Sequence, residues 1–185
     1  MRKIIAVYIV GVLLACLSSC ASFDVELWKS KSTLNTDKKI AIEQMERIMN
    51  ALQDRDAEML KSMFAKNALA EISDIQAMIA ELYDYVPCCS ENMEYRGSIV
   101  GGLFEDGQRM KDHCISFDVK TSDGVYRFAF KYISEDTENP DNVGLWSLYV
   151  IDQDDDTDPE FAYRADSQYI PGIHIGIKNV LPEGA

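Results

Sequence analysis

The chain has 185 residues, a hydrophobic fraction of 47 % and a formal net charge of −13, from 18 Lys and Arg against 31 Asp and Glu. This length suits one ordinary domain with a short flanking segment. An acidic chain is repelled by nucleic-acid phosphate and by anionic lipid headgroups, so the charge argues against both as partners.

The first twenty residues predict an export signal that ends in a lipid-modified cysteine. Arg2 and Lys3 precede an almost wholly apolar stretch over residues 4–17, which is the layout of a cleaved secretory signal. Leu17-Ser18-Ser19-Cys20 then resembles the bacterial lipobox, in which a diacylglycerol is attached to the cysteine and the chain is cut before it. We therefore expect residues 1–19 to be a lipoprotein signal peptide. Cys20 would carry diacylglycerol and palmitate and hold the protein on the extracytoplasmic face of a bacterial cell membrane.

Two other interpretations of this segment remain open. An uncleaved transmembrane helix would need roughly 20 apolar residues, more than residues 4–17 supply. An ordinary signal peptide cut elsewhere, for example after Ala15, would leave Cys20 as an unmodified thiol. Stable anchoring needs more than one acyl chain, and a lipobox cysteine supplies more than one.

After a predicted tether over residues 20–36, one domain is expected over residues 37–185. Its first half predicts three helices, because apolar residues recur at intervals of three and four. Asp56 is the expected N-cap of the second helix, which ends near Asn67. Ser73 and Gln76 have the spacing of a capping box for the third helix, which Pro87 stops. The apolar positions of the three helices are Ala41, Met45, Ile48, Met49 and Leu52, then Met59, Leu60, Met63 and Phe64, then Ile75, Met78, Ile79, Leu82 and Tyr83.

Past Pro87 the apolar period changes from about 3.6 to 2, which predicts strands. The apolar segment Pro171–Gly176 is a candidate for a last edge strand. Helices followed by strands indicate an α+β domain, here three N-terminal helices on a curved antiparallel sheet of four to five strands. The four longer strands are expected over residues 95–104, 113–120, 126–132 and 143–152.

This order of elements resembles the nuclear transport factor 2-like, or cystatin-like, superfamily. Ile42–Ala65, Asp74–Val86 and Leu145-Trp146-Ser147-Leu148-Tyr149-Val150 are similar to a family of bacterial lipoproteins described as domain of unknown function 5104, over residues 36–152. The resemblance implies a sheet curled into a cone around the helices, with a cavity at its open end. Relatives with this fold include SnoaL-like cyclases, ketosteroid isomerases and non-catalytic binding modules, so the fold does not choose the function.

Six residues are candidates for lining such a cavity. His113 alternates with apolar neighbours on its strand and could act as a base inside the cone. A histidine without an identifiable partner is weak evidence for catalysis, and a structural role competes with this interpretation. Tyr126 and Phe128 belong to an aromatic stripe that would line a pocket or pack in the core. The candidates at the rim are Tyr83, Tyr85 and Tyr149.

The cysteines and an acidic loop carry weaker signals. A disulfide from Cys88 or Cys89 to Cys114 would tie the helical half to the sheet, whereas unreactive buried thiols explain the same residues. A redox or metal site at the cysteines lacks the usual CxxC spacing. Four carboxylates echo the 1, 3, 5, 7 positions of a calcium loop, although Thr157 and Tyr163 depart from it and a solvated acidic loop is the simpler interpretation. These four residues are Asp152, Asp154, Asp156 and Asp158.

No GxSxG, Gly-rich phosphate loop or HExxH occurs in the sequence. We therefore expect a non-catalytic binding module, without a cofactor unless calcium binds, that recognises a small molecule or an envelope protein. The alternatives are a SnoaL-like or isomerase-like cavity enzyme using His113, and a structural or assembly lipoprotein of the envelope. An open cavity would favour binding or catalysis, and a filled one would favour the structural role.

Overall fold

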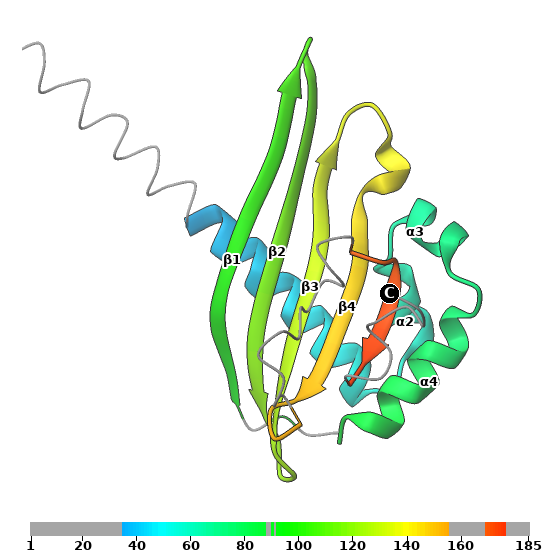
Figure 1. Cartoon of the computed structure of the whole chain (residues 1–185), viewed down its shortest axis with the longest axis vertical. Helices are drawn as coiled ribbons and strands as arrows, with labels where there is room; N and C mark the ends of the chain where they lie inside the picture. The colour runs from blue at the N-terminus through cyan, green and yellow to red at the C-terminus, as the bar shows by residue number, and fades with distance from the viewer. Residues whose placement is uncertain (1–34, 88–89, 91, 156–168, 177–185) are drawn as a thin grey trace, which may run out of the picture. The chain divides into compact units, whose positions relative to one another are not determined.

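The computed structural model describes residues 35–87, 90, 92–155 and 169–176. The chain divides into two units, Met1–Lys39 and Ile40–Ala185. In the first unit the described residues, 35–39, are helical. In the second unit helices come first and strands follow, so the α+β class predicted from the sequence is confirmed (Figure 1).

The described residues contain four α-helices, where the sequence predicted three. The second predicted helix is divided in two, because the chain leaves helical geometry after Ser62 to pair with a strand. Ala65 donates its backbone N–H to Leu145 at 2.9 Å, and Leu145 donates to the Met63 carbonyl at 2.8 Å. The helices span residues 35–53, then Ala57–Ser62 (α2), Lys66–Glu71 (α3) and Ile75–Tyr85 (α4).

Aspartate side chains begin two of these helices. Asp56 caps α2 as predicted, and its Oδ1 accepts a hydrogen bond from the Met59 backbone at 2.8 Å. In α4 the cap is Asp74, one residue after the Ser73 of the predicted capping box, and Asp74 accepts from the Ala77 backbone at 3.0 Å. Helix α4 ends at Tyr85, before the proline that was expected to stop it.

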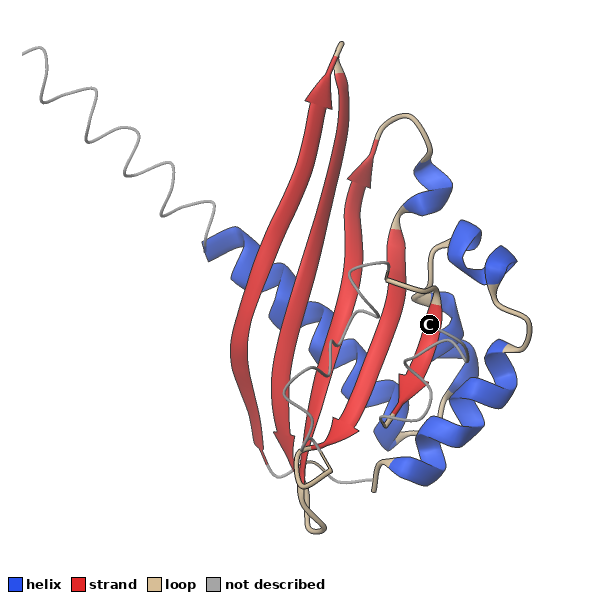
Figure 2. Cartoon of the chain, in the orientation of Figure 1, coloured by secondary structure: helices blue, strands red, loops and turns tan. Residues whose placement is uncertain are grey.

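Five strands form one open, mostly antiparallel sheet in the order β1-β2-β3-β4-β5 (Figure 2). The predicted last strand is present, but it pairs with β4 in parallel rather than antiparallel. The edges of the sheet are therefore β1 and β5. The strands are Asn92–Glu105 (β1), Gln108–Lys120 (β2), Val125–Asp136 (β3), Gly144–Asp152 (β4) and Gly172–Ile175 (β5).

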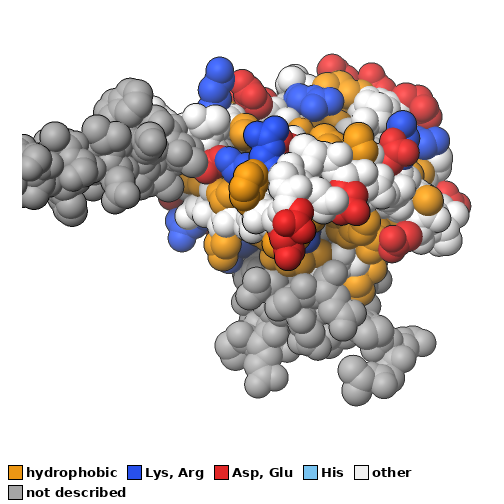
Figure 3. All heavy atoms as spheres, turned by 90° about the horizontal axis from the view of Figure 1, so that it is seen from above, with side chains coloured by type: hydrophobic (Ala, Val, Ile, Leu, Met, Phe, Trp, Pro, Cys, Tyr) orange, Lys and Arg blue, Asp and Glu red, His pale blue; other side chains and the backbone are white. Residues whose placement is uncertain are grey.

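The β1–β2 hairpin extends past β3 and β4 (Figure 1). Its two-residue turn, Asp106-Gly107, has positive φ angles of 49° and 82°, which suit the right-handed twist of a hairpin. Seen from this end of the molecule, hydrophobic side chains lie at the surface among charged ones (Figure 3).

Bulges in the strands set which residues share a face. The β1–β2 register shifts between Tyr95 and Gly97, so Arg96 has no partner residue on β2. A second shift between Lys131 and Tyr132 places Leu145 opposite Tyr132, on the side of the sheet that faces the helices. Strict alternation along β4 would place Leu145 on the same face as Tyr149, and the bulge is the reason that the two residues lie on opposite faces.

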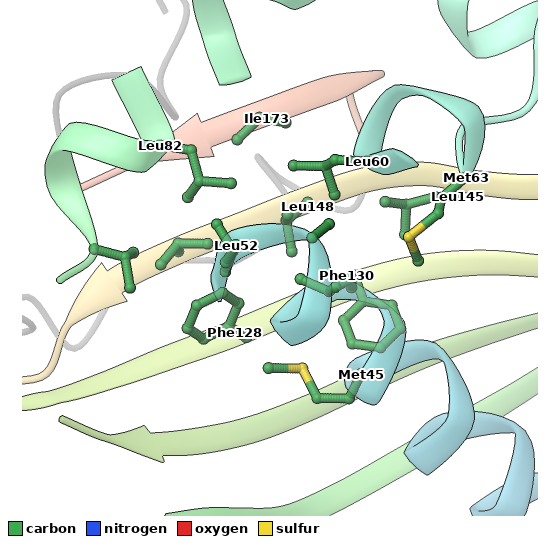
Figure 4. Packing of buried hydrophobic residues seen from close by; sticks show 14 of the residues in the cluster. Met45, Leu52, Leu60, Met63, Leu82, Phe128, Phe130, Leu145, Leu148 and Ile173 are labelled. Atoms are coloured by element: carbon green, nitrogen blue, oxygen red, sulfur yellow. The ribbon is translucent and has the colours of Figure 1, made fainter. Parts of the chain in front are cut away.

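One face of the sheet packs against the helices through a continuous apolar core (Figure 4). Residues 40–53 of the first helix supply Met45 and Ile48, both fully buried, and the strands supply aromatic and aliphatic residues from alternate positions. Burial of such side chains is the main force that holds the helices on the sheet. The buried strand residues of this core are Ile115, Phe117, Val119, Tyr126, Phe128, Phe130, Leu145, Leu148, Val150, Ile173 and Ile175.

Candidate functional site

A groove crosses the face of the sheet opposite the helices. Its floor is a row of neighbouring residues on four strands, in which Gly97 pairs with Ser116, Ser116 with Ala129, and Ala129 with Tyr149. The first three side chains are small, so they leave a hollow of about 570 Å³ between the larger residues around them. This volume is within the range of small-molecule sites.

The walls of the groove come from the rows on either side of this floor. Ile99 and Cys114, which pair with each other, lie on one side, and Arg96 and Arg127 lie on the other. Tyr169 closes the groove from the segment that precedes β5. The groove thus combines apolar surface with two guanidinium groups, which can bind an anionic group.

Both arginines contact one carboxylate, Asp118. Arg127 Nε donates to Asp118 Oδ1 at 2.8 Å, and Arg96 Nε lies 3.4 Å from Oδ2. Burial alone would raise the pKa of Asp118, but the hydrogen bond from Arg127, the nearby Gln153 side chain and the charges of both arginines together lower it. Asp118 is therefore ionised at neutral pH. Asp118 thus pairs with both guanidinium groups that border the groove.

Arg96 is the more accessible of the two arginines. Its side chain is 49 % exposed, against 26 % for Arg127, and it also contacts the exposed Glu94 at 3.1 Å. Arg96 owes this position to the β1 bulge, which turns it toward the groove. It is the residue best placed to meet an incoming anion.

The far end of the groove is formed by Tyr149. Its ring stacks on His174 of β5 with 4.6 Å between ring centroids, and His174 Nε2 lies 2.9 Å from the Ile170 carbonyl. The Tyr149 and Ser147 hydroxyls are buried and make no hydrogen bond of ordinary geometry among the described residues. Burial raises the pKa of Tyr149 to about 12, although the Ile170 backbone and the Ser147 side chain lower it in part.

Tyr169 is fixed from two sides. Trp146 Nε1 donates to the Tyr169 carbonyl at 2.9 Å, and the Lys131 ammonium lies over the Tyr169 ring, 4.8 Å from its centroid. These contacts attach the segment before β5 to β3 and β4. The wall that Tyr169 contributes is therefore positioned by the sheet itself.

The six residues predicted to line a cavity are not brought together in this groove. Only Tyr149 lines it, whereas Phe128 and Tyr126 lie in the core on the opposite face, 0 % and 6 % exposed. The Tyr83 hydroxyl donates to the Ala51 carbonyl at 3.3 Å. Tyr85 accepts from the Asp152 backbone at 2.9 Å and packs edge-on against Tyr126.

His113 faces the helices, as its strand position predicted, but it is fully buried. Its Nε2 lies 2.9 Å from Ser134 Oγ, and its ring lies 6.4 Å from that of Tyr132. The next residue, Cys114, points to the opposite face and lines the groove. His113 is therefore separated from the groove by the sheet, which leaves it without access to a ligand there.

The other predicted sites fall partly or wholly outside the described residues. Cys88 and Cys89 lie there, so a disulfide to Cys114 stays a prediction. Asp152 accepts from the Asp154 backbone at 3.0 Å, as in a turn, whereas Asp156 and Asp158 are not described. Among the described residues there is no group of three or more His, Cys, Asp or Glu side chains placed to hold a metal ion.

The lipid-anchor prediction also concerns residues that the structure does not describe, because Cys20 lies within residues 1–34. None of the described helices is both long and apolar enough to cross a bilayer.

Sequence reasoning missed the floor of the groove, which consists of Gly97, Ser116 and Ala129. Ser116 and Ala129 are small residues that alternate with buried apolar residues on their strands, whereas Gly97 lies between the polar residues Arg96 and Ser98. That pattern was visible in the sequence. The sequence does not reveal the register of the strands, and only this register shows that the three residues are neighbours.

A family model described as a domain of unknown function, DUF5104, matches residues 47–153, which is more than half of the chain. The matched range includes β1 to β4 and every groove residue named above except Tyr169. A search of curated proteins found no match.

Proposed function

We propose that this chain, which belongs to the family described as domain of unknown function DUF5104, is a lipid-anchored extracytoplasmic binding module that takes a small ligand in the groove. The observation that carries the proposal is the row of three small residues beside Tyr149, which leaves about 570 Å³ open. The opposite face of the sheet is filled by the core.

The groove favours a ligand with an apolar body and one anionic group. Ile99 and Ala129 offer apolar surface for the body, and the buried Tyr149 bounds the groove beside them. Arg96, with half of its side chain exposed, offers a positive charge that can pair with the anionic group. Asp118 holds both arginines in position. A carboxylate, sulfonate or phosphate ester could each pair with a guanidinium in this way.

The anchor is supported by the lipobox-like residues Leu17-Ser18-Ser19-Cys20 behind an apolar segment that follows Arg2 and Lys3. Two acyl chains on one cysteine would hold the module at the membrane surface. Its strongly acidic composition would limit contact with anionic headgroups.

We further propose that the domain belongs to the nuclear transport factor 2-like superfamily. The order of helices before a mostly antiparallel sheet, with the helices on one face, supports this. The superfamily resemblance implies a cavity between sheet and helices, whereas the groove lies on the other face. Binding here would therefore use a surface different from the cone interior.

A fluorescent probe with the proposed chemistry tests the groove. Anilinonaphthalene sulfonate has an aromatic body and one anionic group, and we expect the full chain in mild detergent to bind it saturably at one site. Ala129→Leu, which fills the floor, should abolish this signal. Ala70→Leu, the same change at an exposed position of α3, should leave it intact. Equal binding by both variants at unchanged melting temperature would show that the probe does not use the groove.

A role in envelope assembly is a second candidate, favoured by the filled core on the helix-facing side. The same observation argues against a cavity enzyme built on His113, because that residue is 0 % exposed and faces the core. An assembly role needs a surface that another chain can recognise, and β1 offers one.

A further inference from the structure

Most of the large exposed hydrophobic side chains in the described part of the chain lie on one strand. Of the six among the described residues, four belong to β1, and the other two, Val143 and Ile170, are only 37 % and 36 % exposed. Such a concentration on the surface indicates a site of interaction. The four residues on β1 are Ile99 at 69 %, Val100 at 39 %, Leu103 at 59 % and Phe104 at 75 %.

These side chains lie on a segment of the edge strand that lacks protecting charges and prolines. Edge strands normally carry lysine, proline or another charge that blocks pairing with a second chain. Residues 97–104 of β1 read Gly-Ser-Ile-Val-Gly-Gly-Leu-Phe, without a charge or a proline. Among the described strands β1 pairs with β2 alone, so within this part of the chain the backbone groups on its other side are available to a further strand (Figure 1).

We propose that two copies of this chain pair antiparallel along β1, about a two-fold axis that passes through Gly101. The axis is perpendicular to the sheet, so each face of one copy continues into the same face of the other. Each residue of one copy then pairs with a residue of the other copy on the same face of the sheet. Because the axis passes through Gly101, the two residue numbers of every pair add up to 202. The two sheets become one continuous sheet, and both β1 edges disappear from the surface.

This register is complementary in both shape and charge. Ile99 lies opposite Leu103 of the second copy, twice by symmetry, on the face that carries the groove. Gly101 meets its own symmetry mate, where the absence of side chains lets the backbones approach. Glu105 of the second copy lies opposite Gly97, next to Arg96, so an acidic residue meets the exposed guanidinium at each end of the interface.

The neighbouring registers are less favourable. An axis through Val100 would place Glu94 opposite Asp106, which brings like charges together. An axis through Gly102 would place Ile99 opposite Glu105. The register through Gly101 avoids both contacts.

A second copy fits this strip better than a lipid surface does. The hairpin end over residues 105–111 carries Glu105 and Asp106 against Arg109 and Lys111, so it has no net charge to attract an anionic membrane. The overall charge of −13 also separates two copies at long range, but such repulsion is screened beyond about 8–10 Å. At contact the interacting segment is uncharged, and its ends carry opposite charges.

The oligomeric state of the full chain in mild detergent tests the proposal. We expect native mass spectrometry to show a dimer that dissociates on dilution. Hydrogen exchange should show that those amides of residues 97–105 that point away from β2 are protected at high concentration and unprotected at low concentration, whereas the amides bonded to β2 are protected at both. A monomer at every concentration, or a dimer whose β1 amides exchange freely, would overturn the proposal.

The first variant introduces a charge in the middle of the proposed interface. Ile99→Lys places two lysines in the dimer and should raise its dissociation constant at least tenfold. Val143→Lys, the same kind of change at an exposed position after η1 (Pro140–Asn142), is the matched control and should leave the constant unchanged. Because Ile99 is 69 % exposed in the monomer, the melting temperature of the diluted variant should not fall.

A charge exchange tests the register itself. Arg96→Glu and Glu105→Arg each place like charges together across the interface and should each weaken the dimer several-fold. The double variant restores opposite charges and should recover most of the loss. A double variant that dimerises no more tightly than the single variants would overturn the Gly101 register.

A vesicle experiment tests the lipid alternative. If residues 97–105 become protected from exchange only when vesicles are added, and the protein stays monomeric, this strip binds lipid instead. Neither result depends on whether the groove binds a ligand.

Discussion

Tyr149 places a hydroxyl group in a buried position where it has no well-formed hydrogen bond. The residue is 1 % exposed, and its ring is held by the stack on His174. A buried hydroxyl is much harder to ionise than one in water, which is why the pKa of Tyr149 rises to about 12. The ring therefore contributes packing, whereas the hydroxyl contributes a sensitivity to alkali.

Tyr149→Phe should separate these two contributions. The folded-state pKa is above the usual value near 10, so the neutral form stabilises the fold below pH 10, and this stability is lost as the pH rises from about 10 to about 12. We expect the variant to lie within about 1 kcal/mol of the wild type at pH 7, because the lost hydroxyl had no good partner. At higher pH its free energy of unfolding should decline less steeply. Urea denaturation at pH 7, 10 and 11.5 measures this, and parallel declines for both proteins would contradict it.

Phe128 illustrates a residue that can serve as core or as pocket wall. It was predicted as a pocket candidate, and it is fully buried between β3 and the helices. Phe128→Ala should lower the free energy of unfolding by about 3–5 kcal/mol, since it removes a large buried side chain. Chemical denaturation measures the loss. A change below about 1 kcal/mol, together with altered probe binding, would instead indicate a pocket wall.

At the scale of elements, the junction between α2 and α3 is held by β4. Phe64 forms a parallel bridge with Leu145, and the two backbone hydrogen bonds around it satisfy groups that a longer helix would have satisfied internally. Gly144 makes this approach possible. A Cβ atom there would lie 2.7 Å from the Ala65 nitrogen and 3.0 Å from the Met63 carbonyl oxygen, and its φ of +136° favours glycine.

Gly144→Ala should therefore destabilise the fold by at least about 2 kcal/mol, because backbone atoms cannot move aside as a flexible side chain can. The control is Gly124→Ala, where the added Cβ would make only ordinary contacts with Asp152, at 3.5 Å and beyond. Thermal unfolding of the two variants gives the comparison. Equal melting temperatures would show that the α2–α3 junction tolerates displacement from β4.

The helices and strands could be predicted because each leaves a local signal. Asp56 was recognisable as a cap, and the alternation around Phe117 or Phe128 as a strand. The break after Ser62 could not be predicted, because it depends on a hydrogen bond to Leu145, more than eighty residues later. The groove was missed for the same reason, since its floor exists only once Gly97, Ser116 and Ala129 are in register.

At the scale of the whole molecule, the lipid anchor proposed for Cys20 would determine where the domain works. Cys20→Ser should abolish incorporation of labelled palmitate and leave residues 1–19 attached, because the proposed processing requires the modified thiol. Cys16→Ser lies inside the predicted signal peptide and should leave labelling unchanged. Metabolic labelling and intact-protein mass spectrometry read out both changes. Palmitate retained in the Cys20→Ser chain would show that another residue is acylated.

The last described strand, β5, pairs with β4 in parallel and also contacts α4, so it lies between these two elements. Gly172 approaches α4 so closely that a Cβ there would meet Met78 Sδ at 3.1 Å, and Ile173 and Ile175 belong to the core. During synthesis, the site between α4 and β4 thus stays unfilled until residue 175 has left the ribosome. For the export proposed above, this order would keep the most stable state of the chain out of reach until β5 has been made.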